Sequence, residues 1–84
     1  MKSLEEIEAI ATQVVDAALC VHRELGPGLL ESAYEMAFCR ELALRGLSFE
    51  RQKAMPVSYK GAALDCGYRV DVIVEDSIVV ELKA

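Results

Sequence analysis

The sequence has no uncharged apolar run long enough to cross a membrane, and its first residues do not show the pattern of a signal peptide. A membrane helix needs about 18 such residues, whereas the longest candidate, residues 9–21, is interrupted by Gln13 and Asp16. The opening MKSLEEIE lacks the apolar block and cleavage site of a signal peptide. We therefore expect no membrane association and a cytoplasmic location.

The cysteines follow no recognisable framework. Cys20, Cys39 and Cys66 are odd in number, and their spacings of 19 and 27 residues match neither a disulfide set nor a zinc motif. We expect reduced, mostly buried thiols. The chain also lacks repeats, linkers and low-complexity segments, so we expect one domain over residues 1–84.

Basic residues are outnumbered, with 9 Lys and Arg against 14 Asp and Glu and a net charge of −5. This balance argues against a general basic surface for nucleic acid, but it permits a site where metal ions neutralise carboxylates. One basic concentration, formed by Arg40, Arg45, Arg51 and Lys53, is either a rim that contacts phosphate or a solvated edge.

Apolar residues are abundant instead. They make up 54% of the chain, which excludes disorder but exceeds what so short a domain buries easily. The excess predicts a homo-oligomer, a protein partner that covers the sheet, or a piece of a larger domain.

The hydrophobic periodicity predicts two helices in the first half. Ser3 and Glu6 have capping-box spacing at the start of the first helix, and the glycines and proline of residues 26–28 end it. A second helix is predicted over residues 29–45, with Gly46 as its stop. The expected apolar positions are Leu4, Ile7, Ile10, Ala11, Val14, Ala18, Val21 and Leu25, then Leu30, Tyr34, Ala37, Phe38 and Leu42.

The second half predicts strands. Residues 48–59 alternate weakly around Pro56, which favours an edge or a bulge, and Lys60-Gly61 supplies a turn. Two β-branched runs, residues 68–75 and 78–83, predict an antiparallel hairpin. The expected fold is α/β or α+β, in the order ααβββ, with two helices on a mixed or antiparallel three-stranded sheet.

This hairpin carries charged residues where a plain strand would not. Asp71 interrupts a valine-rich run, and burial of a carboxylate is costly without compensation. Glu81 and Lys83 share one strand face, because side chains alternate. A three-residue loop, residues 75–77, would place Asp71 opposite Glu81, whereas a two-residue loop would place it opposite Leu82 and divide the site.

Two carboxylates and an ammonium group close together suit metal-assisted phosphate chemistry. Carboxylate oxygens are ligands for Mg²⁺, and Lys83 would orient or activate the attacking water or neutralise transition-state charge. Glu31 and Glu35, one helical turn apart, offer a further acid. The alternative is an exposed hairpin face with a cross-strand ion pair, worth about 0.2–1 kcal/mol.

Several motifs occur together in this chain. Gly28, Glu31 and Tyr34 form the pattern G-x-x-E-x-x-Y. Other short segments are VHRELGPG (21–28), LRGL (44–47), FERQ (49–52), YKG (59–61), YRVD (68–71) and ELK (81–83). In this order and spacing, from about Leu4 to the last residue, the chain resembles the bacterial GxxExxY proteins, a family assigned to the PD-(D/E)XK nuclease superfamily.

The resemblance implies a role for individual residues. Asp71 matches the superfamily's metal-binding Asp, Glu81 its second metal ligand and Lys83 its catalytic Lys. Glu31 matches the helix glutamate, as a further metal ligand or an anchor, and Tyr34 and Gln52 are candidate supporting residues.

The implied fold is a restriction-endonuclease-like core. The implied function is hydrolysis of nucleic-acid phosphodiesters with Mg²⁺ or Mn²⁺, with DNA favoured over RNA. The alternative is a catalytically inactive, nuclease-derived module that acts through protein–protein interaction.

The chain departs from the superfamily pattern at two points. Val70 stands where the motif's name has proline, and the superfamily core continues past the ExK strand, whereas this chain ends at Ala84. We therefore expect a C-terminally truncated domain that self-associates or is poorly soluble. The strand residues Val70, Val72, Val74, Val80 and Leu82 would then lack the layer that covers them.

Overall fold

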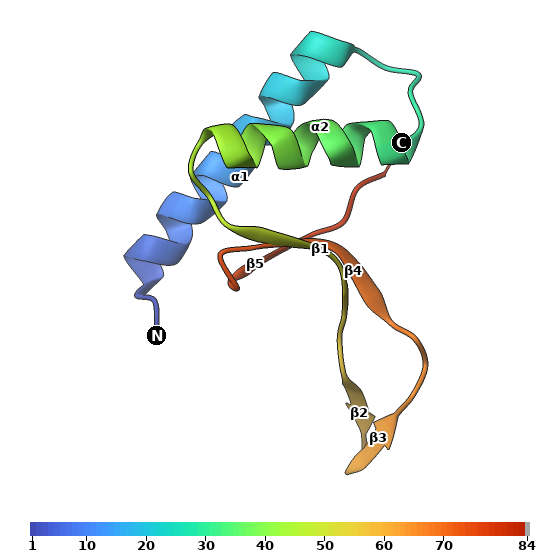
Figure 1. Ribbon diagram of the computed structural model, residues 1–84. Coiled ribbons are helices and arrows are strands. Elements are labelled where there is room, and N and C mark those ends of the chain that lie inside the picture. The colour runs from blue at the N-terminus through green and yellow to red at the C-terminus, as the bar shows by residue number, and fades with distance from the viewer. Residues whose placement is uncertain (84) are drawn as a thin grey trace.

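The two helices precede all of the strands. The computed structural model describes residues 1–83 (Figure 1). Its elements are α1 (Leu4–Leu25), α2 (Glu31–Leu44), β1 (Phe49–Ala54), β2 (Val57–Tyr59), β3 (Ala62–Leu64), β4 (Arg69–Val74) and β5 (Ile78–Val80). Within the described part, neither helix combines the length and apolar character needed to cross a membrane. The domain boundary predicted at Ala84 lies outside the described residues.

Both ends of α1 follow the sequence signals. The Glu6 amide donates to the Ser3 hydroxyl at 3.1 Å, and the Ser3 amide donates to the Glu6 carboxylate at 3.2 Å, so the capping box is confirmed. At the other end the Gly26 amide donates to the His22 carbonyl at 2.8 Å. The buried face is narrower than the predicted stripe. Val14 and Val21 are buried as predicted, but Leu4, Ala18 and Leu25 are exposed, and Ala17, which was not predicted, is buried.

The strands form two antiparallel sheets, and the fold class is α+β, consistent with the restriction-endonuclease-like core that the resemblance implies. The three-stranded sheet has the order β1-β4-β5, and β2 and β3 form a separate pair. The predicted strand over residues 48–59 is divided at Met55-Pro56, where proline lacks the amide that a ladder needs. β3 was not predicted, and β5 ends at Val80 rather than at Lys83.

Of the two loops considered between β4 and β5, the structure has the three-residue one. Val74 pairs with Ile78 and Val72 pairs with Val80, which leaves residues 75–77 as the loop. Continued by one step, this register sets Asp71 opposite position 81, just beyond the end of β5. The Glu75 carboxylate accepts the Ser48 amide at 2.6 Å and also the Ser48 hydroxyl, so the loop is tied to the start of β1.

The helices already cover the valine stripe of β4. Val72 and Val74 are both 0% exposed and pack with Phe38 and Leu42 of α2 and with residues of α1. Val70 is also buried, and Val80 and Leu82 are partly buried. The expectation that these residues lack a covering layer is therefore wrong. The apolar face of the two helices packs on the apolar face of the sheet and covers it.

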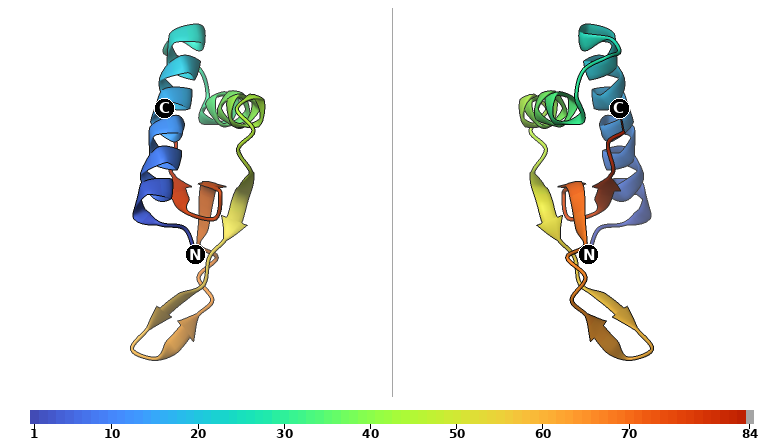
Figure 2. Two further views of the ribbon diagram at one scale, coloured as in Figure 1. Left: turned by 90° about the vertical axis from the view of Figure 1, so that its left-hand side faces the viewer. Right: turned by 90° about the vertical axis from the view of Figure 1, so that its right-hand side faces the viewer.

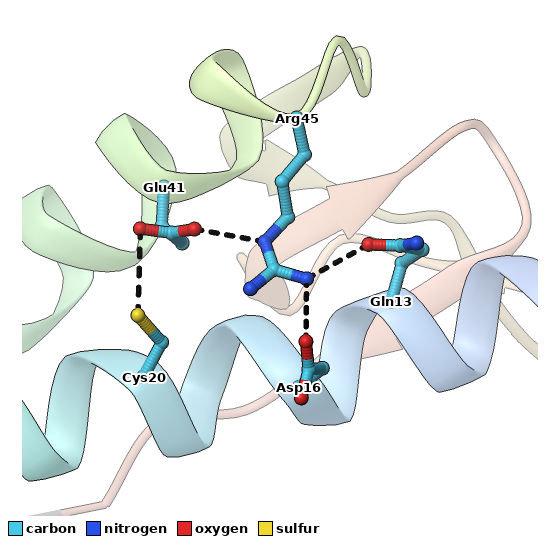
Figure 3. A network of polar contacts seen from close by, with 5 residues as sticks. All are labelled: Gln13, Asp16, Cys20, Glu41 and Arg45. Carbon is cyan, nitrogen blue, oxygen red and sulfur yellow. Dashed lines mark hydrogen bonds and ion pairs between the residues drawn. The ribbon is translucent and has the colours of Figure 1, made fainter.

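Arg45 ties the two helices together at the end of α2 (Figure 3). Its Nε donates to Glu41 at 2.8 Å, and its Nη1 donates to Gln13 at 2.8 Å and to Asp16 at 2.9 Å on α1. The bonds to Glu41 and Asp16 raise the pKa of Arg45 above its usual value. The Arg45 guanidinium therefore joins α1 to α2. Because it is engaged in these bonds, Arg45 does not belong to a rim that contacts phosphate.

The tie between Glu75 and Ser48 predicts a pH-dependent stability. Hydrogen bonds from Ser48 lower the pKa of Glu75 below its usual value of 4.5, so the ionised carboxylate stabilises the fold above that value. This contribution is lost as the pH falls through the lowered pKa. In thermal unfolding, we expect the gap in Tm between wild type and Glu75→Gln to be largest near neutral pH and to shrink below about pH 4.5. Glu8→Gln, at an exposed site on α1, is the control, and a gap that stays constant to pH 2.5 would contradict the assignment.

Candidate active site

Asp71 lies half-buried on β4, the central strand of the sheet. Its Oδ2 accepts the Leu82 amide at 2.8 Å, and its Oδ1 lies 3.5 Å from the Gln52 side-chain nitrogen. These donors compensate the carboxylate, which explains how an acid is tolerated in a valine-rich strand. The bond also holds the segment that follows β5 against β4, after the regular ladder has ended.

Glu35 is the buried carboxylate of the site, with 7% exposure. The Nε and Nη2 of Arg51 both lie 2.9 Å from its Oε2, and the Gln52 side-chain nitrogen donates to its Oε1 at 2.9 Å. The side-chain nitrogen of Gln52 therefore bridges the carboxylates of Glu35 and Asp71. The backbone of Gln52 is left-handed, with a φ of 49°. From the sequence, Glu35 was expected near the site because it lies one helical turn after Glu31. No feature of the sequence indicated that it pairs with Arg51.

One hollow is lined by three acidic side chains, those of Glu31, Glu35 and Asp71. We call it the carboxylate hollow; it measures about 350 Å³ and is lined by Glu31, Ser32, Glu35, Arg51, Gln52, Asp71 and Leu82. The oxygens of Glu31 and Asp71 are hard donors of the kind that Mg²⁺ prefers, and this ion commonly takes one or two carboxylates plus water and substrate phosphate. Within residues 1–83, no three His, Cys, Asp or Glu side chains are grouped tightly enough to hold a metal ion by themselves.

Lys83 lies at a different cavity. This turn cavity measures about 390 Å³ and is lined by Ala18, Val21, His22, Pro27, Gly28, Leu29, Glu31, Tyr34, Phe38, Leu82 and Lys83. Glu31 and Leu82 line both spaces, so the carboxylate hollow and the turn cavity adjoin. Figure 1 shows the chain running from β5 up to the start of α2. Glu81 is exposed and does not contribute to either lining.

The Tyr34 hydroxyl holds the turn between the two helices, and this turn contains Gly28, the glycine of the G-x-x-E-x-x-Y pattern. This hydroxyl donates to the Gly26 carbonyl at 2.5 Å and accepts the Leu29 amide at 3.2 Å. Gly28 has a φ of 97°, which favours glycine. The tyrosine thus closes the turn between the helices and fixes the entry to α2, whose N-cap, Leu30, makes no side-chain cap bond. Glu31 is the first residue after this closed turn.

The basic residues near the site are largely occupied by carboxylates. Arg51 pairs with Glu35, and Lys53 lies 3.4 Å from Glu50 and 3.7 Å from Asp76. With Arg45 bound to α1, three of the four residues of the predicted basic concentration are engaged within the chain. A phosphate rim at these positions is therefore not supported.

The cysteines are free thiols in unlike surroundings. Cys39 is buried, and this burial raises the pKa of its thiol, which keeps the group protonated. Cys20 is half-buried and Cys66 is exposed. All three cysteines are free, as expected of reduced thiols. We also expected most of them to be buried, but only Cys39 is fully buried.

Comparison with known proteins yields a family. The model of the PD-(D/E)XK nuclease superfamily matches residues 8–84, a span that includes Glu31, Asp71, Glu81 and Lys83. No curated protein and no solved structure matches the chain. The finer resemblance to the GxxExxY proteins stays a prediction.

The contacts of Tyr34 predict a structural role for its hydroxyl. Tyr34→Phe removes the group that bridges Gly26 and Leu29, so we expect the free energy of unfolding to fall by about 1 kcal/mol. Tyr59→Phe, at a site 63% exposed, is the matched control and should leave stability unchanged. Denaturant unfolding measures both variants. An unchanged stability for Tyr34→Phe would show that the hydroxyl does not hold the turn.

Proposed function

Because the chain belongs to the PD-(D/E)XK nuclease superfamily, we propose that it hydrolyses phosphodiester bonds in nucleic acid with a divalent metal ion, Mg²⁺ or Mn²⁺. The observation that carries the proposal is the shared hollow of Glu31 and Asp71. These acids come from a helix and a strand far apart in the sequence, and Lys83 lies at the adjoining turn cavity.

The proposed metal ligands are Asp71, Glu81 and Glu31. When bound, the metal ion would polarise the phosphate and lower the pKa of a bound water. Asp71 keeps one oxygen on the Leu82 amide, and this bond holds the neighbouring Glu81 and Lys83 close to β4. Lys83 is exposed, and its ammonium group would orient the attacking water or stabilise negative charge on the phosphate in the transition state.

Gln52 and Glu35 are the proposed supporting residues. Glu35 is paired with Arg51 and accepts a bond from Gln52, so the Gln52 amide is held beside Asp71. A fixed neighbour of this kind limits the orientations of the Asp71 carboxylate. Tyr34 supports the site indirectly, through the turn that precedes Glu31.

A cleavage assay with two site variants tests the proposal. Wild type should cleave supercoiled plasmid DNA or labelled single-stranded DNA or RNA with Mg²⁺ or Mn²⁺, and EDTA should abolish cleavage. Asp71→Asn keeps an oxygen that can accept the Leu82 amide but removes the charge that binds metal. Lys83→Ala removes the ammonium group. We expect each variant to lose at least about 100-fold in rate.

The control variant is Asp76→Asn, at an exposed acid in the loop before β5. It changes the charge by the same amount as Asp71→Asn and should keep wild-type activity. Equal activity in Asp71→Asn and wild type would refute the assigned site. If wild type neither cleaves any of these substrates nor binds Mg²⁺ or Mn²⁺ in calorimetry, the enzymatic function itself fails.

The second candidate function is an inactive module that acts through protein contacts. It draws support from apolar residues on the outer face of α1, where Leu4, Val15 and Leu19 are 72%, 59% and 45% exposed. Their spacing puts them on one stripe of the helix, away from the core residues. This function would be favoured by a folded protein without metal binding and without cleavage.

A further inference from the structure

The outer side of α1 carries an apolar stripe that the described part of the chain leaves uncovered. In Figure 2 this helix runs along the edge of the molecule, and no other described element lies on its outer side. At 3.6 residues per turn, Leu4, Ala11, Val15 and Leu19 fall within an arc of about 80°, and all of them except Ala11 are at least 45% exposed. We call these four residues the α1 stripe. Removal of such a surface from water is favourable, so the stripe is a candidate contact.

The charged residues beside the stripe differ between the two ends of α1. Glu5 and Glu8 lie near the start of the helix, and His22 and Arg23 lie in its last turn. Glu5 and Arg23 are 18 residues apart, which is about five turns, so both project along the same flank of the stripe. Among residues 1–83, neither of these two side chains forms an ion pair. The exposed side of α1 is thus acidic at one end, apolar in the middle and basic at the other end.

From this arrangement we infer that two copies of the chain form an antiparallel dimer through α1, in which the α1 stripe of one copy packs on that of the other. A parallel pairing would set the acidic end of one helix against the acidic end of the second. The antiparallel pairing instead sets Glu5 and Glu8 beside Arg23 of the second copy, so the charges are complementary. The surface is therefore complementary to itself, as a two-fold symmetric interface requires.

A two-fold axis that passes close to Val15 satisfies the apolar and the charged contacts together. It pairs Val15 with itself and sets Leu19 of one copy against Ala11 of the other, because these two positions lie four residues to either side of the axis. The small Ala11 side chain adjoins a hollow of about 440 Å³, which gives the leucine room to pack. This hollow is lined by Ala11, Thr12, Gln13, Val15, Asp16 and Leu19. The same axis brings the acidic end of each helix to the basic end of the other.

The proposed dimer leaves the carboxylate hollow open, because no residue of the α1 stripe lines that hollow. The inference therefore does not rest on the proposed function, and the two are tested separately. A chain that cleaves nucleic acid as a monomer would overturn the dimer and leave the proposed function intact. A dimer that neither binds metal nor cleaves would do the reverse.

A matched pair of leucine variants tests whether the α1 stripe is the contact. Leu19→Lys puts a charge into the proposed interface, and Leu44→Lys makes the same change at a 64% exposed position on α2. Lysine is a good helix former, so both variants should fold, which circular dichroism checks. In sedimentation equilibrium we expect a wild-type dimer with a Kd below about 100 µM, a Kd at least about tenfold higher for Leu19→Lys, and the wild-type value for Leu44→Lys. A monomeric wild type at this concentration, or equal weakening in both variants, would overturn the inference.

An exchange of charges tests the antiparallel orientation. Glu5→Arg and Arg23→Glu each place like charges together at both ends of the dimer, so we expect each to weaken dimerisation at least about fivefold at low salt. The double variant Glu5→Arg/Arg23→Glu again pairs opposite charges and should regain most of the lost affinity, although it combines the effects of both changes on the helix itself. A double variant that dimerises no better than either single variant would overturn the antiparallel pairing.

Discussion

The hydrogen bond from the Leu82 amide to the Asp71 carboxylate is the contact on which the rest of the site depends. β5 ends at Val80, so the ladder no longer fixes the residues that follow it. The Asp71 side chain supplies the missing acceptor at 2.8 Å and keeps Glu81 and Lys83 beside the central strand. One carboxylate thus fixes the local backbone and offers its second oxygen to the carboxylate hollow.

Two further sets of hydrogen bonds, from Tyr34 and from Glu35, position α2 beside Asp71. The Tyr34 hydroxyl closes the turn from Gly26 to Leu29, which sets where α2 begins and hence where Glu31 lies. Farther along α2, Glu35 binds Arg51 and Gln52 of β1, so the helix and the sheet are joined beside Asp71. Tyr34 and Glu31, the two residues named in the motif with Gly28, therefore have different roles: Tyr34 closes the turn, and Glu31 lines the carboxylate hollow.

Features encoded by neighbouring residues were predicted well. The capping box of Ser3 and Glu6 and the stop at Gly26 each depend on a few adjacent residues. The loop before Ile78 was left open between two and three residues, and the structure has three. β3 was missed because its three residues, Ala62–Leu64, show no alternation of apolar and polar side chains. The cover of Val72 and Val74 by the helices, and the pairing of Glu35 with Arg51, depend on tertiary contacts that no local signal encodes.

The central claim is that Asp71 and the residues brought to it hold a divalent metal ion. Addition of Mn²⁺ to ¹⁵N-labelled protein tests this most directly, because the ion broadens the amide resonances of nearby residues. The account predicts that the first signals lost belong to Glu31, Asp71 and Leu82, and that Asp71→Asn abolishes the effect. Broadening centred instead on the exposed acids Glu5, Glu6 and Glu8 of α1, or spread evenly over the surface, would contradict it.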